Sequence, residues 1–299
     1  MNGILLVDKP TGMTSHDVVD KVRKAAKMRK IGHTGTLDPA ATGLLVLCLG
    51  AATRLSEHFT ALGKVYEGTM RLGLSTTSYD LQGEVVSERE VPDLDRAAIQ
   101  ARCDAFLGAI EQIPPMVSAV RIGGERLYKK ARKGEVIERP PRPVQVDRFE
   151  VLSYEAPDAV VSVACSSGTY VRSLCHDVGE ALECGAVLAS LRRLSVGKHH
   201  VDNAATLEEL TGPDAVSERL LPMGSALELP VGIVNPDALP ILANGGTLSS
   251  GNLVEGCPIT SGWLQLKNSE GELLALAQVE STPVEAFVHP KRVFYTGRD

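Results

Sequence analysis

A glycine-punctuated run near the N-terminus places the strongest constraint on what this chain can fold into. Residues 32–45 read GHTGTLDPAATGLL and contain a single carboxylate, Asp38, with Pro39 directly after it. Glycine permits backbone conformations with positive φ, and proline fixes the turn that follows the acid. A surface Asp-Pro turn has the same composition. The run also suits a rigid loop that presents one carboxylate, but not a phosphate-cradling loop, because the Walker-type Lys-Ser/Thr pair and the GxGxxG pattern are absent.

Composition and length narrow the class of protein. The 299 residues are 43% hydrophobic, which suffices for a sizeable core and about two domains. The N-terminal segment has no basic region before its short apolar run, and no apolar stretch is long enough to cross a bilayer, so we expect a soluble, cytoplasmic protein. The six cysteines form no Cys-x-x-Cys pair and the seven histidines no spaced ligand set. Neither a disulfide framework nor a metal site is predicted.

The charge is unevenly distributed although the net charge is −6. Two segments are rich in basic residues, and each alone could be a solvated helix face. Together with the Asp38 loop they favour a polyanionic ligand. The basic residues are Lys21, Arg23, Lys24, Lys27, Arg29 and Lys30 in the first segment, and Arg121, Arg126, Lys129, Lys130, Arg132, Lys133, Arg139, Arg142 and Arg148 in the second.

The periodicity of apolar residues predicts a mixed α+β body. A capping box at Thr14 and Asp17 predicts a helix that runs to about Lys30, and Asp95 predicts the cap of another that ends near Gly108. Further helices are expected at 53–62, from 168 and within 207–221. Strands are expected at 4–7, 66–72, 84–86, 144–154, 160–165 and 188–196, and residues 44–49 form a compact apolar run. Residues 117–143 predict strands, a short helix and an exposed arm. From Pro230 onward, short β-prone runs between turns predict a small β-barrel, which gives domains at 1–229 and 230–299.

Four more segments carry recognisable motifs. Residues 8–15 read DKPTGMTS, 64–68 KVYEG, 167–174 SGTYVRSL and 188–193 LASLRR. With the Asp38 loop, these segments resemble the TruB family of bacterial tRNA pseudouridine-55 synthases over nearly the whole first 200 residues. The resemblance implies a catalytic domain with a mixed, mainly antiparallel sheet flanked by helices, followed by a PUA-like β-barrel that touches the acceptor side of tRNA. It implies isomerisation of the T-loop uridine without a cofactor. We also expect the protein to be a monomer.

The resemblance also assigns three catalytic residues. Asp38 matches the family nucleophile, and Tyr66 the tyrosine that lies against the target base and whose hydroxyl would serve proton transfer at C5. Arg172 matches an active-site arginine. Burial raises the pKa of a carboxyl, whereas a neighbouring guanidinium lowers it by roughly one to three units. We therefore expect Arg172 to keep Asp38 ionised.

Further residues are assigned to substrate or RNA binding. His33 would fill the stack that the flipped base vacates, and Tyr170 and Leu191 would contact the base or Asp38. Asp80 would form hydrogen bonds within the site, although the preceding residues are Thr77-Ser78-Tyr79 where the family often has Thr-Asp-Thr-x. The other binding residues are Lys9, Lys129 and Lys130, and at least one of Arg192 and Arg193 is expected to meet RNA phosphate or solvent.

Two other functions fit parts of the pattern. An RNA-binding or tRNA-chaperone module on the same fold, without turnover, would use the same basic segments, but Asp38, Tyr66 and Arg172 together argue against it. An Asp-dependent hydrolase would need a second nearby acid or a metal set, and the sequence offers neither.

The second basic segment generates a test. Neutralising Lys129, Lys130, Arg132 and Lys133 should weaken tRNA binding and flatten its salt dependence, because fewer counterions are released when fewer phosphates are contacted. Titrations at several salt concentrations measure the slope. An unchanged slope would show that this segment is solvated surface that does not contact RNA phosphates.

Overall fold

The computed structural model describes residues 1–116, 121–122, 125–126, 137–257, 260–281 and 286–295. Lys129 and Lys130 therefore lie outside the described residues, as does most of the segment in which a short helix was predicted. No helix in the described part of the chain is long and apolar enough to span a bilayer.

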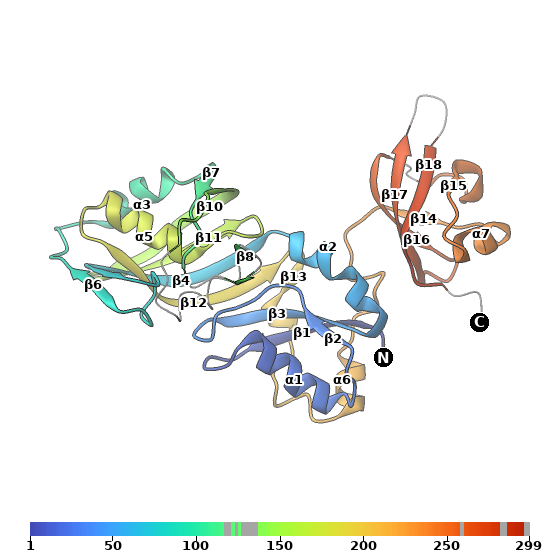
Figure 1. The fold of residues 1–299 in the computed structure, drawn as a ribbon, viewed down its shortest axis with the longest axis horizontal. Helices are drawn as coiled ribbons and strands as arrows, with labels where there is room; N and C mark the ends of the chain where they lie inside the picture. The colour runs from blue at the N-terminus through green and yellow to red at the C-terminus, as the bar shows by residue number, and fades with distance from the viewer. Residues whose placement is uncertain (117–120, 123–124, 127–136, 258–259, 282–285, 296–299) are drawn as a thin grey trace. The chain divides into compact units, whose positions relative to one another are not determined.

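A nine-stranded sheet forms the body of the protein (Figure 1). Its main path runs β1-β3-β12-β4-β11-β10-β7, with β2 beside β3 and β13 beside β12. The pairs from β12 through β4, β11 and β10 to β7 are antiparallel, and β3 pairs with β12 in parallel. The strands are β1 (Gly3–Lys9), β2 (Ile31–His33), β3 (Thr42–Leu49), β4 (Lys64–Leu72), β7 (Gly108–Gln112), β10 (Arg142–Glu155), β11 (Asp158–Cys165), β12 (Ala186–Val196) and β13 (His199–His200). Strands at 4–7, 66–72, 144–154, 160–165 and 188–196 are confirmed, and the apolar run 44–49 lies in β3.

Short helices accompany the sheet. The predicted capping box of α1 (Ser15–Ala25) is present at Thr14 and Asp17, but the helix ends before Lys30 because Lys27 adopts a left-handed conformation with φ 49°. Asp95 caps α3 (Arg96–Asp104) through the amide of Ala98. The others are η1 (Gly50–Leu55), α2 (Ser56–Ala61), α5 (Val171–Ala181), η2 (Val201–Asn203) and α6 (Pro213–Glu218), the last covering only part of the predicted 207–221.

The main core lies where α3 and α5 pack on the sheet, α3 on β10 and α5 on β12. Alternate residues of β11, including Val161 and Val163, point into it together with Leu174 and Val178 of α5. Two hairpins extend the body: β5 (Leu74–Thr76) with β6 (Val85–Glu88), and β8 (Arg121–Ile122) with β9 (Glu125–Arg126).

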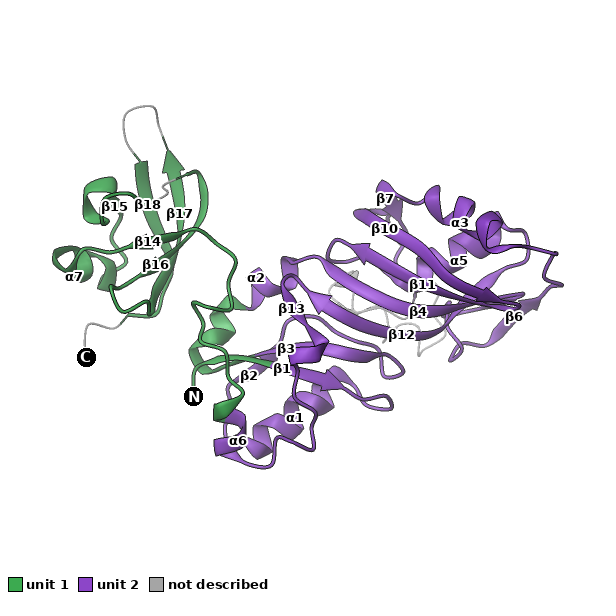
Figure 2. Cartoon of the chain, turned by 180° about the vertical axis from the view of Figure 1, so that it is seen from behind, with its two compact units in different colours: residues 1–5, 48–55, 217–299 green, residues 6–47, 56–216 purple. Residues whose placement is uncertain are grey.

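The C-terminal part has its own sheet and core. Its five strands follow the order β14-β16-β17-β18-β15, antiparallel except for β14 with β16. They are β14 (Val231–Ile233), β15 (Leu248–Ser249), β16 (Gly262–Lys267), β17 (Leu273–Ser281) and β18 (Ala286–Val293), with η3 (Pro236–Ala238), α7 (Leu239–Ala243) and η4 (Ser250–Asn252) between them. By contacts the chain divides into two compact units, 1–5, 48–55 and 217–299 in one, and 6–47 and 56–216 in the other (Figure 2). The predicted α+β fold class is confirmed.

Two glycines give a matched test of how closely β3 approaches β12. Gly43 has φ 99°, and a Cβ there would lie 2.3 Å from the carbonyl oxygen of Arg193 on β12. Gly12 has φ 84° but open space around the same position. Gly12→Ala should cost about 1–2 kcal/mol for the left-handed backbone alone. Gly43→Ala should cost clearly more, because it adds a backbone clash. Urea unfolding of both variants measures the difference in their free energies of unfolding. If both variants lose the same stability, the paired strands accommodate the added Cβ without an energetic cost.

Candidate active site

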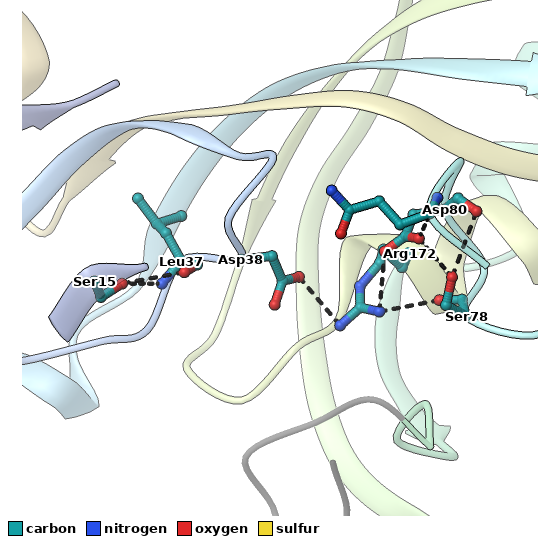
Figure 3. A network of polar contacts seen from close by, with 7 residues as sticks. Ser15, Leu37, Asp38, Ser78, Asp80 and Arg172 are labelled. Atoms are coloured by element: carbon teal, nitrogen blue, oxygen red, sulfur yellow. Dashed lines mark hydrogen bonds and ion pairs between the residues drawn. The ribbon is translucent and has the colours of Figure 1, made fainter. Parts of the chain in front are cut away.

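The Asp38 loop connects β2 to β3 and is fixed by a side chain from α1. The Ser15 hydroxyl accepts from the amide of Leu37 at 2.8 Å and donates to the Leu37 carbonyl at 3.1 Å (Figure 3). Ser15 and Leu37 are buried, so both hydrogen bonds are shielded from water. The residue before the carboxylate is therefore held on both its backbone groups.

Lys9 supports the other side of the same loop. Its side chain is fully buried, and Nζ donates to the carbonyls of Pro10 at 2.9 Å and Pro39 at 3.3 Å. Burial lowers the pKa of Lys9 to about 8, while the nearby Asp38 carboxylate acts in the opposite direction. The structure thus places Lys9 beneath the loop.

Arg172 brings two carboxylates together. It is the second residue of α5, with its side chain only 5% exposed, and Nη2 lies 3.1 Å from Oδ2 of Asp38 (Figure 3). Its Nη1 lies 3.2 Å from Oδ2 of Asp80 and donates to the carbonyl of Ser78 at 3.0 Å. The predicted pairing of Arg172 with Asp38 is present, and Asp80 belongs to the same cluster. The expectation that no second acid lies near Asp38 was therefore wrong.

Asp80 is itself held by its own loop. Its Oδ1 accepts from the Ser78 hydroxyl and from the amide of Gln82, the latter at 3.0 Å. Oδ2 remains for Arg172. Hydrogen bonds within its own loop therefore orient the Asp80 carboxylate in the absence of substrate.

The pKa of Asp38 reflects opposing influences. Enclosure by the protein raises it most, the Arg172 guanidinium lowers it, the Asp80 carboxylate raises it, and Lys9 lowers it. The net direction is upward, although 43% of the side chain is reached by solvent. Arg172 acts in the predicted direction, but it offsets only part of the cost of burial.

A cavity of about 430 Å³ opens beside Asp38. Its walls come from the Asp38 loop, from β4 and β12, and from the turn before α5. Among the residues assigned to the site from sequence, it is lined by Asp38, Tyr66, Tyr170, Arg172 and Leu191. His33, at the end of β2, is partly buried and is not part of this lining.

Tyr66 and Arg193 meet at the wall of the cavity. Tyr66 of β4 is 9% exposed, and burial raises the pKa of its phenol while the Arg193 guanidinium lowers it. Arg193 is buried, donating from Nε to the carbonyl of Leu44 at 2.7 Å and from Nη2 to that of Gly35 at 3.1 Å. It therefore fixes the start of the Asp38 loop as well as facing the phenol.

The adjacent arginines of β12 point to opposite faces, as strand geometry requires. Arg192 forms a bidentate pair with Asp8, at 3.0 and 2.7 Å, and is 42% exposed. Arg192 thus reaches solvent, as expected of at least one of these two arginines. The structural role of Arg193 was not predicted. This role could have been inferred from the sequence, because residues two positions apart in a strand share a face and Leu191 was already assigned to the site.

Gln112 is another residue that the sequence did not single out. At the end of β7, its amide accepts from the Tyr170 amide nitrogen at 2.7 Å and donates to the Tyr170 carbonyl at 3.0 Å. These bonds fix the residue that caps α5, two positions before Arg172. Nothing in the sequence around Gln112 distinguishes it from an ordinary strand residue.

The family to which the chain belongs is shown by comparison of its sequence with family models. The family model of the TruB pseudouridylate synthase N-terminal domain matches residues 23–171, and that of the tRNA pseudouridylate synthase B C-terminal domain matches residues 172–228. The chain belongs to the TruB family. This confirms the predicted family and the predicted class of enzyme, an isomerase that makes pseudouridine.

Relatives cover most of this TruB-family chain. A tRNA pseudouridine synthase B from Opitutus terrae is 46% identical over 235 residues, 78% of this chain and 97% of the relative. That of Thermotoga maritima is 42% identical over 281 residues, 93% of this chain and 90% of the relative. Among solved structures, an H/ACA RNP bound to a substrate RNA containing 2'-deoxyuridine aligns with TM-score 0.76 and 26% identity, covering 98% of this chain and 85% of that chain. A Cbf5-Nop10-Gar1 complex aligns over the same shares with TM-score 0.76 and 28% identity.

The two carboxylates on Arg172 should affect stability differently. The folded protein raises the pKa of Asp38, so the carboxyl ionises more readily in the unfolded chain. Stability therefore falls as the pH rises above the ordinary carboxyl pKa and Asp38 becomes ionised. Asp38→Asn should therefore be at least as stable as wild type at neutral pH, with the difference vanishing in acid. Asp80→Asn should be less stable, because it removes a hydrogen-bonded partner from a buried guanidinium. Thermal unfolding across pH tests both; a clear loss of stability in Asp38→Asn at neutral pH would contradict this account.

Proposed function

We propose that this chain is a tRNA pseudouridine-55 synthase, which isomerises the T-loop uridine with Asp38 as nucleophile. The proposal rests above all on one observation: the single carboxylate of the Asp38 loop lies 3.1 Å from a buried guanidinium at the wall of a cavity lined by Tyr66 and Leu191. Family membership and the names of the relatives support the tRNA substrate.

The reaction needs a group that can form and then release a bond. The N1–C1′ bond of the uridine breaks, the uracil turns within the cavity, and C5 bonds to C1′. The C5 proton then leaves and N1 takes up a proton, so that the product is an isomer of the substrate. An ionised carboxylate can act as nucleophile or base and depart again once the new bond has formed. Asp38 combines this chemistry with partial solvent access, so a base that has left the RNA stack can reach it.

The Arg172 cluster supplies the electrostatics of this step. A guanidinium shared between two carboxylates stays in place when the charge on one of them changes. When Asp38 becomes bonded to substrate and loses its charge, Asp80 still neutralises Arg172. The site thus avoids leaving a buried unpaired cation during turnover.

Tyr66 would hold the base. Its buried ring forms part of the cavity wall, where an aromatic face can stack on uracil. Because burial raises its pKa, the resting phenol is neutral. The Arg193 guanidinium would stabilise a phenolate that forms as the C5 proton is transferred.

Binding of the tRNA body would depend on basic surface. The exposed lysines of α1 and the second basic segment would contact phosphates of the T-stem and T-loop, and the C-terminal domain, taken as 230–299, would contact the acceptor side. In this proposal the working unit is a cytoplasmic monomer, with His33 in the vacated stack.

The decisive experiment uses an unmodified tRNA transcript and maps pseudouridine at single-nucleotide resolution. Wild type should modify the T-loop uridine and no other position in the transcript. Asp38→Asn, nearly isosteric, should reduce turnover by at least 10⁴-fold, in the range seen when a nucleophile is removed, and should keep its fold and tRNA affinity. Glu180→Ala, on the exposed side of α5, is the matched control and should turn over like wild type. Near-normal turnover by Asp38→Asn would exclude Asp38 as the nucleophile.

A further inference from the structure

The loop that carries Asp80 contains a strained residue. Tyr79 has φ 63°, in the left-handed region that residues other than glycine seldom adopt. Such a conformation persists only where the surroundings fix it, and it is frequent at functional sites. Here the unusual residue lies between Ser78 and Asp80, both of which contact Arg172. The turn at Tyr79 is what allows the chain to present both groups to one guanidinium.

The ring of Tyr79 is held by α5. It stacks on the imidazole of His176 with ring centroids 4.0 Å apart and an interplanar angle of 10°. His176 follows Arg172 by four positions, so the two side chains leave the same face of the helix on successive turns. One helix face therefore holds the loop twice, through the guanidinium and through the imidazole.

The chemistry of His176 fits a packing role. Its Nδ1 is buried and has no hydrogen-bond partner in the described part of the chain. Burial lowers the pKa of His176, Glu180 acts against this and Arg89 acts with it. The neutral ring thus contributes its face to Tyr79, and a flat apolar ring of similar size could replace it.

The other side of the loop is attached to β12. The Tyr79 amide donates to the Thr76 carbonyl at 3.3 Å, and the Tyr79 carbonyl accepts from the Leu188 amide at 3.0 Å. Just beyond Leu188, the pairing of β12 with β4 shifts register, and Leu191 then enters the cavity wall. The backbone of Tyr79 is therefore fixed by the sheet, while its ring packs on α5.

We propose that Tyr79 and His176 are positioning residues of this site: their stacked rings hold loop 78–80 on α5, and the loop sets the guanidinium of Arg172 against Asp38. This rests on the proposed function.

The test compares loss of the stack with its conservative replacement. Tyr79→Gly removes the ring but adopts φ 63° without strain, and His176→Ala removes the other ring. Tyr79→Phe and His176→Phe keep a flat face, and Glu150→Ala, at an exposed position of β10, is the control. For each variant, kcat and KM are measured on an unmodified tRNA transcript, and the pKa of Asp38 is followed by ¹³C-carboxyl NMR and by the acid limb of kcat.

The two ring deletions should lower kcat about ten- to hundredfold with little change in KM, as expected when a reacting group is misplaced. The pKa of Asp38 should rise, because Arg172 lowers it more strongly than Asp80 raises it, and Lys9, the other cation that acts on Asp38, is held elsewhere. The phenylalanine variants and Glu150→Ala should behave like wild type.

Three results would overturn the inference. The first is a wild-type kcat in both ring deletions, and the second is a loss of kcat with an unchanged Asp38 pKa. The third is that circular dichroism shows both deletions to be unfolded, since the stack would then stabilise the whole domain and not the site. Failure of the proposed function has a separate signature, because wild type itself would then form no pseudouridine in tRNA. In that case the NMR titration still reports whether the stack controls the Asp38 carboxyl.

Discussion

The site depends on one guanidinium shared between two carboxylates. Arg172 is buried and reaches Asp38 with one nitrogen and Asp80 with the other. Each partner comes from a loop fixed by its own hydrogen bonds, through Ser15 beside Asp38 and through Gln82 at Asp80. Because a buried cation without a partner is costly, the fold cannot easily move either loop away from α5. The same interaction thus joins three distant segments and orients the group proposed to react.

Placing a reactive carboxylate in this position costs stability. Enclosure raises the pKa of Asp38 more than Arg172 and Lys9 lower it, so the ionised form is disfavoured relative to the unfolded chain. A fully exposed aspartate would hold its charge more readily, but it would not line a cavity that can receive a base. The nearby cations therefore reduce a penalty that burial creates, and they do not make Asp38 unusually acidic.

Sequence motifs predicted the fold class, the strands of the central sheet and the approach of Arg172 to Asp38, because short motifs recur with fixed local geometry. The end of α1 was predicted too late, since Lys27 carries no sequence mark of its left-handed backbone. The contribution of Gln112 was not predicted, because its two bonds to Tyr170 depend on a tertiary approach across 58 positions. Contacts made by ordinary polar residues with distant backbone are invisible to local patterns.

The strand β12 shows how local alternation produces these long-range contacts. Its Leu188 amide holds the turn at Tyr79, Leu191 lines the cavity, and Arg193 fixes the carbonyls of Gly35 and Leu44. Leu191 and Arg193 share a face because strand side chains alternate, whereas Arg192 between them turns away to Asp8. A shift of one residue in this strand would exchange the two arginines and withdraw support from the Asp38 loop. The bulge after Leu188 therefore sets the register on which the site depends.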